Sequence, residues 1–192
     1  MANNAKKVAV GKPLASGGAY IAVSGTAVPT DISTALDAAF KATGYVSSDG
    51  LVMSMSADTN EIIAWGGDTV RKVQTSHDVT VALTMLETGA TTAGIYYGTG
   101  NVTVVAATSG HGEQVNIEVT SAELPRSVWV YELADGDRTG RVVLPDAQVT
   151  ERGDVNFIDE DAVSYPITLT AYPDEDGVKA YIFWDDGQKT GE

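Results

Sequence analysis

The feature that most constrains the fold is a long alternation of residue types in TVRKVQTSHDVTVALTML, residues 69–86. From Val73 to Met85 the odd positions are mostly apolar, and the even positions are mostly Gln, Ser, Asp or Thr, broken by Ala82. Successive side chains of a β-strand point to opposite faces, so this period predicts one strand with an apolar and a polar face. A strand of about 15 residues extends about 50 Å, more than a small sandwich covers. We therefore expect part of it to project from its own sheet or to pair beyond it.

Most of the remaining chain also has the pattern of β-strands. Alternation and apolar runs separated by Gly, Asn and Asp turn residues mark residues 50–56, 60–67, 93–108, 113–124, 126–151 and 163–186. The run 93–108 is predicted to be a hairpin around Gly98–Asn101, and Asp-Gly pairs predict turns at 135–136 and 176–177. Such spacing of turns is typical of a mainly β sandwich or barrel.

One helix and one N-terminal arm are expected beside the strands. TDISTALDAAFKATG, residues 30–44, has Asp31 or Thr30 as N-cap, Gly44 as a stop and apolar residues at helical spacing. Residues 1–18 contain glycine, proline and serine, with a small apolar patch at Val8, Val10 and Leu14. We expect residues 1–18 to be a flexible arm that orders on a partner, and residues 19–192 to form a single domain.

The composition excludes several classes of function. The chain has 26 acidic and 12 basic residues, for a formal charge of −14, so tight sequence-independent binding of nucleic acid or of anionic membranes is disfavoured. The first 50 residues hold four lysines against three aspartates, whereas residues 154–192 hold ten acids against two lysines. This asymmetry would suit head-to-tail contacts, or it reflects solvated loops. The absence of cysteine excludes disulfides and thiol catalysis. We expect no membrane span and no secretion signal.

No arrangement of residues points clearly to catalysis. His77 and His111 lie in a strand pattern and a turn pattern, and the chain contains no nucleophile elbow, zincin or P-loop motif. Residues 135–146, DGDRTGRVVLPD, match several positions of a calcium loop, but a hairpin with polar turn residues is the simpler interpretation. The acid clusters 159–161 and 174–176 lie in turn-like segments, where carboxylates are normally solvated. We expect no catalytic site, cofactor or bound metal.

The order of these elements resembles that of the major tail tube proteins of long-tailed, non-contractile bacteriophages. The resemblance covers residues 40–90 and 163–184. It rests on the GYVSSDG turn at 44–50, a strand pair joined by AWGG at 64–67, and the closing strand ITLTAYPD at 167–174. Each motif is weakly specific by itself, and their order carries the resemblance.

The resemblance implies a β-sandwich or half-barrel with one flanking helix, an N-terminal arm and a long projecting hairpin. It implies six-membered rings whose inner sheets join into a barrel, stacked into a virion tail tube through which the tape measure protein and then DNA pass. Partners would be identical copies, the tape measure protein and other tail proteins, made in the host cytoplasm, with no membrane binding. The arm and the loop would bridge rings, which makes the candidate contact residues Val8, Val10, Leu14, Trp65, Gly66, Gly67, Asp68 and Arg71.

A tube also gives the acidity a purpose. A net-negative channel wall would repel phosphate and ease the passage of DNA, and Asp78 is the candidate channel-facing acid from its position in the alternation. The alternative function is an Ig-like binding or adhesion module, and an enzyme is a more distant third. Rings or tubes in electron micrographs would favour the tube subunit, whereas a monomer under every condition would favour the module.

Overall fold

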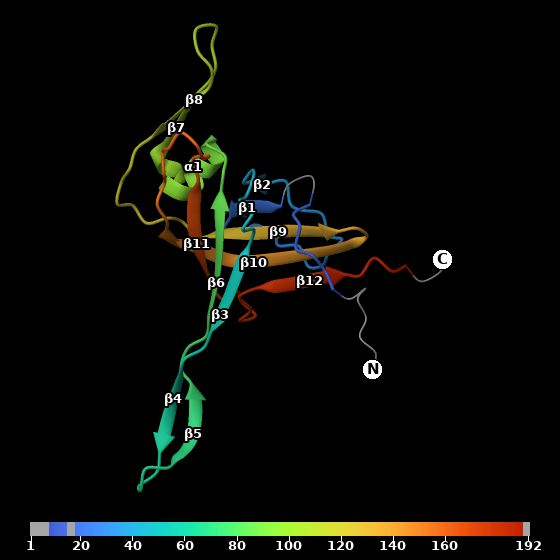
Figure 1. Ribbon diagram of the computed structural model, residues 1–192, viewed down its shortest axis with the longest axis vertical. Coiled ribbons are helices and arrows are strands. Elements are labelled where there is room, and N and C mark those ends of the chain that lie inside the picture. The colour runs from blue at the N-terminus through green and yellow to red at the C-terminus, as the bar shows by residue number, and fades with distance from the viewer. Residues whose placement is uncertain (1–7, 15–17, 190–192) are drawn as a thin grey trace.

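The fold is built on one large antiparallel sheet. The computed structural model describes residues 8–14 and 18–189 and places the large sheet beside two separate hairpins (Figure 1). The strands of the large sheet are, in chain order, β1 (Ala19–Val23), β2 (Lys41–Ala42), β3 (Val52–Ser56), β6 (Asp78–Met85), β9 (Ser127–Asp135), β10 (Arg138–Arg152), β11 (Tyr165–Ala171) and β12 (Tyr181–Asp185). Their spatial order is β2-β1-β9-β10-β11-β6-β3, and β12 also pairs with β10. The mainly β fold class expected from the sequence is confirmed.

Strand β10 belongs to both halves of this sheet. Its first part pairs with β9 on one side and β12 on the other, and its last part, from Ala147, pairs with β11. The ladder with β9 is irregular between Leu144 and Ala147, where Pro145 has no N–H to donate. We call β2, β1, β9, β12 and β10 up to Leu144 the first half-sheet, and β3, β6, β11 and β10 from Ala147 the second half-sheet.

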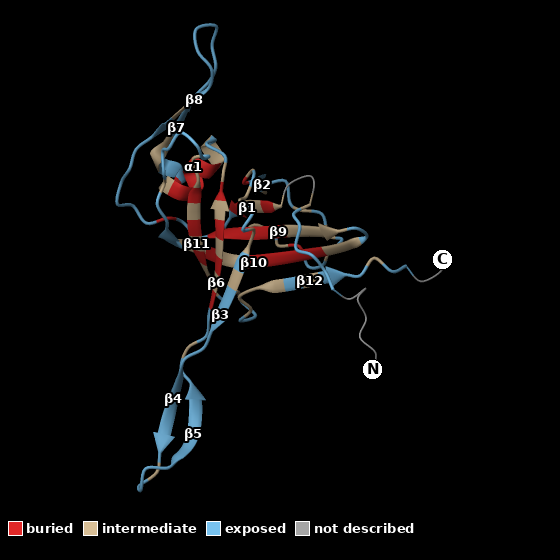
Figure 2. Cartoon of the chain, viewed as in Figure 1, coloured by how far each residue is buried: buried red, intermediate tan, exposed pale blue. Residues whose placement is uncertain are grey.

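The two half-sheets meet over a single core. Alternate residues of β6, namely Val79, Val81, Leu83 and Met85, are buried together with Trp129 of β9. Figure 2 shows the buried residues gathered where the two half-sheets cross. The Trp129 indole N–H donates to Ser127 Oγ at 2.8 Å, so its one polar atom is satisfied inside the core. The apolar positions of the alternation in the sequence are therefore the residues of β6 that face the core.

The segment 69–86 is two strands and not one. Residues Thr69–Gln74 form β5, which pairs with β4 (Thr59–Ile63) in a hairpin that projects from the sheet (Figure 1), and β6 follows after a break. The break is held by Asp58, whose carbonyl accepts a hydrogen bond from the Thr75 N–H at 2.8 Å and whose carboxylate accepts one from Ser76 Oγ at 3.0 Å. The expectation of one continuous strand was wrong. Both parts pair with strands of their own chain, so the length of the segment is no evidence for pairing between copies.

The one α-helix of the described residues lies elsewhere than expected. Residues 30–44 contain no helix, and α1 (Ala90–Tyr97) occupies part of the segment for which a hairpin was predicted. Thr, Ile and Tyr favour strands, so local preference gave no helical signal there. The helix is held by burial of Ile95 and Tyr96 in the core and ends at Gly98, whose positive φ of 97° suits glycine. Tertiary packing overrides local preference at this position.

Residues 31–34 are diverted from a helix by one buried side chain. Asp31 Oδ1 accepts hydrogen bonds from the Ser33 and Thr34 N–H groups, as a helix N-cap would. Arg141 of β10 then donates to the carbonyl oxygens of Asp31 and Thr34, both at 2.7 Å. The Asp31 carbonyl is the acceptor that the first turn of a helix would need. The segment is consequently fixed as an irregular loop against the first half-sheet.

The remaining predicted hairpins have mixed outcomes. The hairpin at 126–151 is confirmed as β9 and β10, joined at Gly136 and Asp137, so residues 135–146 form a turn and a strand. The strands predicted within 163–186 are confirmed as β11 and β12, but each pairs with β10 and not with the other. After α1 and the 3₁₀ turn η2 (Thr99–Asn101), β7 (Val102–Val105) and β8 (Gln114–Ile117) form a second hairpin, at the opposite end of the molecule from β4 and β5 (Figure 1).

Replacing Arg141 with alanine is expected to destabilise the fold by about 3 kcal/mol, because it leaves the Glu132 carboxylate buried without its partner and frees the loop at 31–34. The Arg141 and Glu132 side chains are 7% and 15% exposed, and they pair at 2.5 Å. Urea unfolding of the dilute protein measures the change. The matched control is Arg126→Ala, which removes a pair to Asp146 whose arginine is 50% exposed and should cost under about 1 kcal/mol. Equal losses in the two variants would contradict this account.

Candidate assembly surfaces

One face of the second half-sheet is covered by hydroxyl groups and not by other parts of the chain. Ser54, Thr80, Thr170 and Gln148 stand directly opposite one another across β3, β6, β11 and β10. Directly opposed residues in a sheet share a face, and the face that these residues share is opposite to that of buried Val81 and Leu169. We call this surface the hydroxyl face, and it comprises Ser54, Ser56, Thr80, Thr84, Gln148, Thr150, Thr168 and Thr170.

The hydroxyl face satisfies itself and offers little to a polyanion. Thr150 Oγ1 and Thr170 Oγ1 share a hydrogen bond of 2.8 Å, and the Tyr172 hydroxyl donates to Gln148 Oε1 at 3.1 Å. Asp78 lies in line with this face at the hairpin end of β6, half exposed, with Lys179 Nζ at 3.8 Å from its carboxylate. Strong phosphate binding requires Lys or Arg, and the hydroxyl face as defined contains neither. The face therefore lacks the cations on which strong phosphate binding depends.

The β3 edge of the second half-sheet is open, whereas the β10 edge carries a bulge at Thr150 and the charged residues Glu151 and Arg152. Among the described strands, β3 pairs only with β6, and residues 148–152 of β10 pair only with β11. Strand β3, VMSMS, has no charged residue or proline, and Val52 and Met55 are 53% and 67% exposed. Edge strands of monomeric proteins are usually protected by charges, proline or bulges. An unprotected edge of this kind is suited to pairing with another chain.

The projecting hairpin of β4 and β5 is exposed along its whole length (Figure 2). A cross-strand ion pair joins Lys72 Nζ to Glu61 Oε1 at 2.6 Å, and Thr69 Oγ1 also donates to Glu61. The lysine partner, with the threonine hydrogen bond, lowers the pKa of Glu61. The hairpin exposes several large apolar side chains, namely Ile62, Ile63, Trp65, Val70 and Val73. A two-stranded hairpin is marginally stable alone, so this surface needs a partner.

The tip of this hairpin is a defined turn. The Ala64 N–H donates to the Asp68 carbonyl at 2.8 Å, and the Gly67 N–H donates to the Ala64 carbonyl at 3.0 Å. Gly66 and Gly67 have φ values of 122° and 97°, which other residues rarely adopt. The turn presents Trp65 with its whole side chain exposed. The structure thus brings the sequence candidates Trp65, Gly66, Gly67 and Asp68 together, with Arg71 a short way along β5 opposite Ile62.

The candidates of the arm lie on a different part of the molecule. Residues 1–7 and 15–17 lie outside the described residues, but 8–14 run beside the turn of β9 and β10. The Leu14 N–H donates to the Glu132 carbonyl at 3.0 Å, and the Val10 N–H donates to the Asp135 carboxylate at 2.9 Å. Val8 and Val10 are exposed, and Leu14 is partly buried. The arm and the hairpin tip therefore offer two separate contact surfaces.

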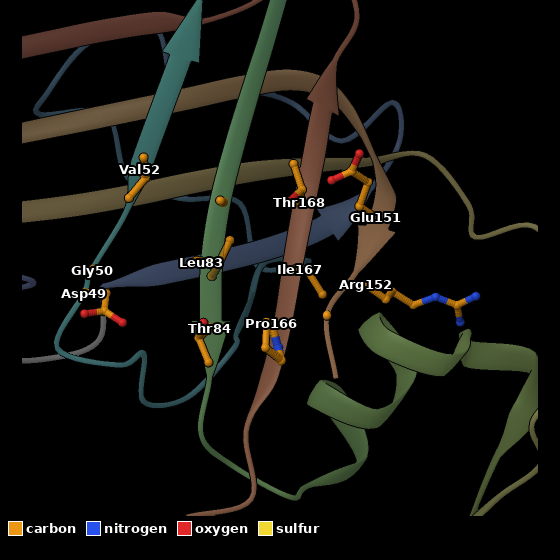
Figure 3. A pocket seen from close by; sticks show the side chains of 12 residues that line it. Asp49, Gly50, Val52, Leu83, Thr84, Glu151, Arg152, Pro166, Ile167 and Thr168 are labelled. Atoms are coloured by element: carbon orange, nitrogen blue, oxygen red, sulfur yellow. The ribbon is translucent and has the colours of Figure 1, made fainter. Parts of the chain in front are cut away.

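Sequence reasoning missed a hollow at the far end of the hydroxyl face. It has a volume of about 270 Å³ and lies between the GYVSSDG turn and the start of β11 (Figure 3). Its apolar lining comes from Val52, Ala82 and Pro166, and the carboxylate residues Asp49 and Glu151 also line it. No pattern along the chain could indicate it, because four separate segments form it.

The described residues bring no cluster of metal-ligating side chains together. In this part of the chain no three His, Cys, Asp or Glu side chains lie where they could hold a metal ion together. The candidate calcium ligands serve other contacts: Asp135 accepts from Val10, and Asp146 pairs with Arg126 at 2.6 Å. The ring nitrogen Nδ1 of His111 lies 2.7 Å from the neighbouring Gly112 carbonyl. No helix in the described ranges has the length and apolar character that a membrane crossing requires.

Comparison with known proteins gives a family. A family model described as phage tail tube protein matches residues 1–190. Among solved structures, the cryo-EM structure of the anti-feeding prophage cap, the AFP tube terminating cap, is 13% identical with a TM-score of 0.45, and the match covers 95% of this chain and 98% of that one. No curated protein matches the sequence.

Acid is expected to loosen the projecting hairpin through Glu61. Because Lys72 and Thr69 hold the pKa of Glu61 below its usual value of 4.5, the stabilising contribution of this group is present above that value and is lost as the pH falls through the lowered pKa. Backbone NMR relaxation of residues 59–74 should show more motion at pH 3 than at pH 6. In Glu61→Gln the hairpin should be looser at pH 6 and change little on acidification. A wild-type hairpin with the same order at both pH values would contradict this expectation.

Proposed function

Because this chain belongs to the phage tail tube protein family and is a structural subunit of a phage tail, we propose that its copies close into hexameric rings. The rings stack into a tube whose channel carries first the tape measure protein and then DNA. The mature location is the virion tail, after synthesis in the host cytoplasm, and other tail proteins contact the tube ends. Residues 19–192 act as one domain behind an N-terminal arm. Family membership favours this function over an Ig-like binding module.

The single observation that carries the proposal is the open second half-sheet, with a hydroxyl face on one side and the core on the other. A monomeric protein would cover or charge both edges of such a sheet, and β3 has neither kind of protection. In a ring, the edges pair between copies and the hydroxyl face becomes the channel wall.

Strand directions allow a continuous wall. Strand β6 is antiparallel to both β3 and β11, and β11 is antiparallel to β10. Strand β3 and the end of β10 therefore run in opposite directions. When all copies of a ring have the same orientation, β3 of one copy lies antiparallel to residues 148–152 of the next. The alternation of strand directions then continues around the whole ring without an edge, as in a closed barrel.

The arm and the hairpin are proposed to connect successive rings. The arm, beside the first half-sheet, would contact a neighbouring copy through Val8, Val10 and Leu14. The hairpin would contact another copy through Trp65, Gly66, Gly67, Asp68 and Arg71. Both segments expose apolar side chains at positions where the chain itself provides no cover. Two separate surfaces per copy are what a stacked assembly requires, because each ring contacts one ring above and one below.

The channel wall is proposed to work by not binding its cargo. Asp78 would face the channel, and the formal charge of −14 would repel the phosphate backbone at long range. At short range the wall would offer hydroxyl groups, whose hydrogen bonds exchange readily with water. DNA would then move along the wall without trapping contacts.

Ring closure can be tested with the variant Ser54→Cys/Thr150→Cys, since the natural chain has no cysteine. Within one chain these positions are three strands apart, about 14 Å, which is too far for a disulfide. Mild oxidation is therefore expected to give a ladder of covalent oligomers that ends at the ring size, together with rings or tubes of the wild type in negative-stain images. The control Ser54→Cys/Thr103→Cys, with the second cysteine on β7, should give no ladder. Wild-type protein that stays monomeric at every concentration tested would contradict the proposal that the copies close into rings.

Adding cations to the hydroxyl face is expected to slow DNA. Phage carrying Thr170→Lys should eject DNA several-fold more slowly at low salt, and the difference should shrink as the salt concentration rises, because the new contacts release counterions. Ejection kinetics followed with a DNA-binding dye measure the effect. Thr103→Lys on β7 adds the same charge away from the channel and should eject at the wild-type rate. Equal rates in all three phages would show that Thr170 does not face the DNA.

A further inference from the structure

We propose that Trp65 at the hairpin tip inserts into the hollow lined by Val52, Ala82 and Pro166 on a second copy of the chain, displaced head to tail. The inference rests on the proposed tube and names the contact that stacks its rings. It assigns a role to the most exposed tryptophan of the described chain and to a hollow that nothing in its own chain fills.

The hairpin tip is built to present one side chain. Two turn hydrogen bonds and two glycines with positive φ fix the backbone around Trp65. A fixed aromatic side chain loses little conformational entropy when it docks, and a tryptophan that becomes buried removes roughly 150–250 Å² of surface from water. Tryptophan is also the residue most enriched among the side chains that dominate binding interfaces.

The other two tryptophan side chains already pack against their own chain. Trp129 is fully buried in the core. Trp184 is partly exposed, but its ring lies on the backbone of Gly140, where an added Cβ would come within 2.6 Å of it. Trp65 has no contact of this kind in the described structure, so it is the tryptophan available to a partner.

The chemistry of the hollow suits an indole and the residues near it. Val52, Ala82 and Pro166 provide apolar surface, and Thr84 and Thr168 lie between them (Figure 3). The indole N–H needs an acceptor when it is buried, and Asp49 and Glu151 provide carboxylates in the lining. Arg152 also lines the hollow, but its guanidinium donates to the Tyr96 carbonyl at 3.2 Å, so the two carboxylates would attract Arg71, which lies on β5 a few residues from Trp65. A hollow of about 270 Å³ is comparable in size with one large aromatic side chain.

A copy cannot fill its own hollow. Strand β6 starts at the base of the projecting hairpin, with Asp78, and reaches the hollow near its other end, with Thr84. Measured along the strands, the tip is roughly 50 Å from the hollow of its own chain, from about 3.3 Å per residue. The tip and the hollow are thus two different surfaces that fit each other, which defines a head-to-tail contact. Contacts of this kind continue without limit along one direction, as a tube does.

The test uses one variant for each side of the contact. Trp65→Ala removes the tip side chain and Thr84→Trp fills the hollow, and each is expected to give rings that do not stack. The critical concentration for tubes should rise about 30-fold or more, as for a dominant interface residue. Trp65→Phe should lose less than Trp65→Ala, and Thr103→Trp, outside the hollow, should assemble as the wild type. Thermal unfolding of each variant checks that the subunit still folds.

Mixing the two defective rings is the decisive measurement. Rings of Thr84→Trp keep an intact tip, and rings of Trp65→Ala keep an intact hollow. The mixture should therefore form pairs of rings but no stacks of more than two rings. In an otherwise natural chain, Asp68→Cys/Thr84→Cys should form disulfides between stacked copies. If the wild type and Trp65→Ala form tubes equally well, the docking proposal is overturned and the tube function stands. A mixture of the two defective rings that forms no pairs would lead to the same conclusion. Wild-type protein that forms no tubes at all would instead overturn the tube function, and the docking with it.

Discussion

Strand β10 pairs with β9 and β12 along its first part and with β11 along its last, and both half-sheets depend on this one strand. The change of partner near Pro145 turns the sheet so that its two halves pack face to face around Trp129 and the apolar side of β6. As a result, the second half-sheet packs against the core on one face only, and no further layer of the described structure lies on its hydroxyl face. Its hydroxyl face and its β3 edge are exposed because none of the described elements covers them. The packing of the subunit and its capacity to assemble therefore have one structural origin.

The exposed apolar residues are distributed in a way that follows from this arrangement. Several of them lie on the β3 edge, on the projecting hairpin and on the described part of the arm, and others lie on the β7–β8 hairpin, on β12 and in the loop at 157–158. The hairpin is the extreme case, since its two strands have no layer beneath them and each side chain in them is exposed. Apolar surface in separate places, with a polar face between them, is typical of a subunit that contacts several copies and keeps one side in water.

The strands could be read from the sequence because alternation reports directly which face is buried, as in Val79 to Met85. The helix could not. The segment at 30–44 has helical spacing, but Arg141, more than 100 residues away, binds the Asp31 and Thr34 carbonyls and fixes a loop. In α1, the Thr, Ile and Tyr residues favour strands, and burial of Ile95 and Tyr96 decides the outcome. Of the candidate site, the hairpin tip was predictable from AWGG and the hollow was not, since only the folded chain brings Asp49 near Pro166.

The distribution of charge refines the idea of a repelling channel. Most of the described acids of the carboxyl-terminal region are exposed, and partly buried Asp174 holds its own turn by accepting hydrogen bonds from the Val178 N–H and the Tyr181 hydroxyl. The central row of the hydroxyl face, Ser54, Thr80, Thr170 and Gln148, is neutral, and acids lie in the rows on either side of it, Asp78 in one and Glu151, opposite Thr168, in the other. In the proposed tube, repulsion would come from these acids and from the summed field of the many copies, which salt screens beyond about 8 Å at physiological ionic strength. At contact the proposed wall would present a face without Lys or Arg, so passage of DNA would depend more on the absence of these cations than on the presence of any particular acid.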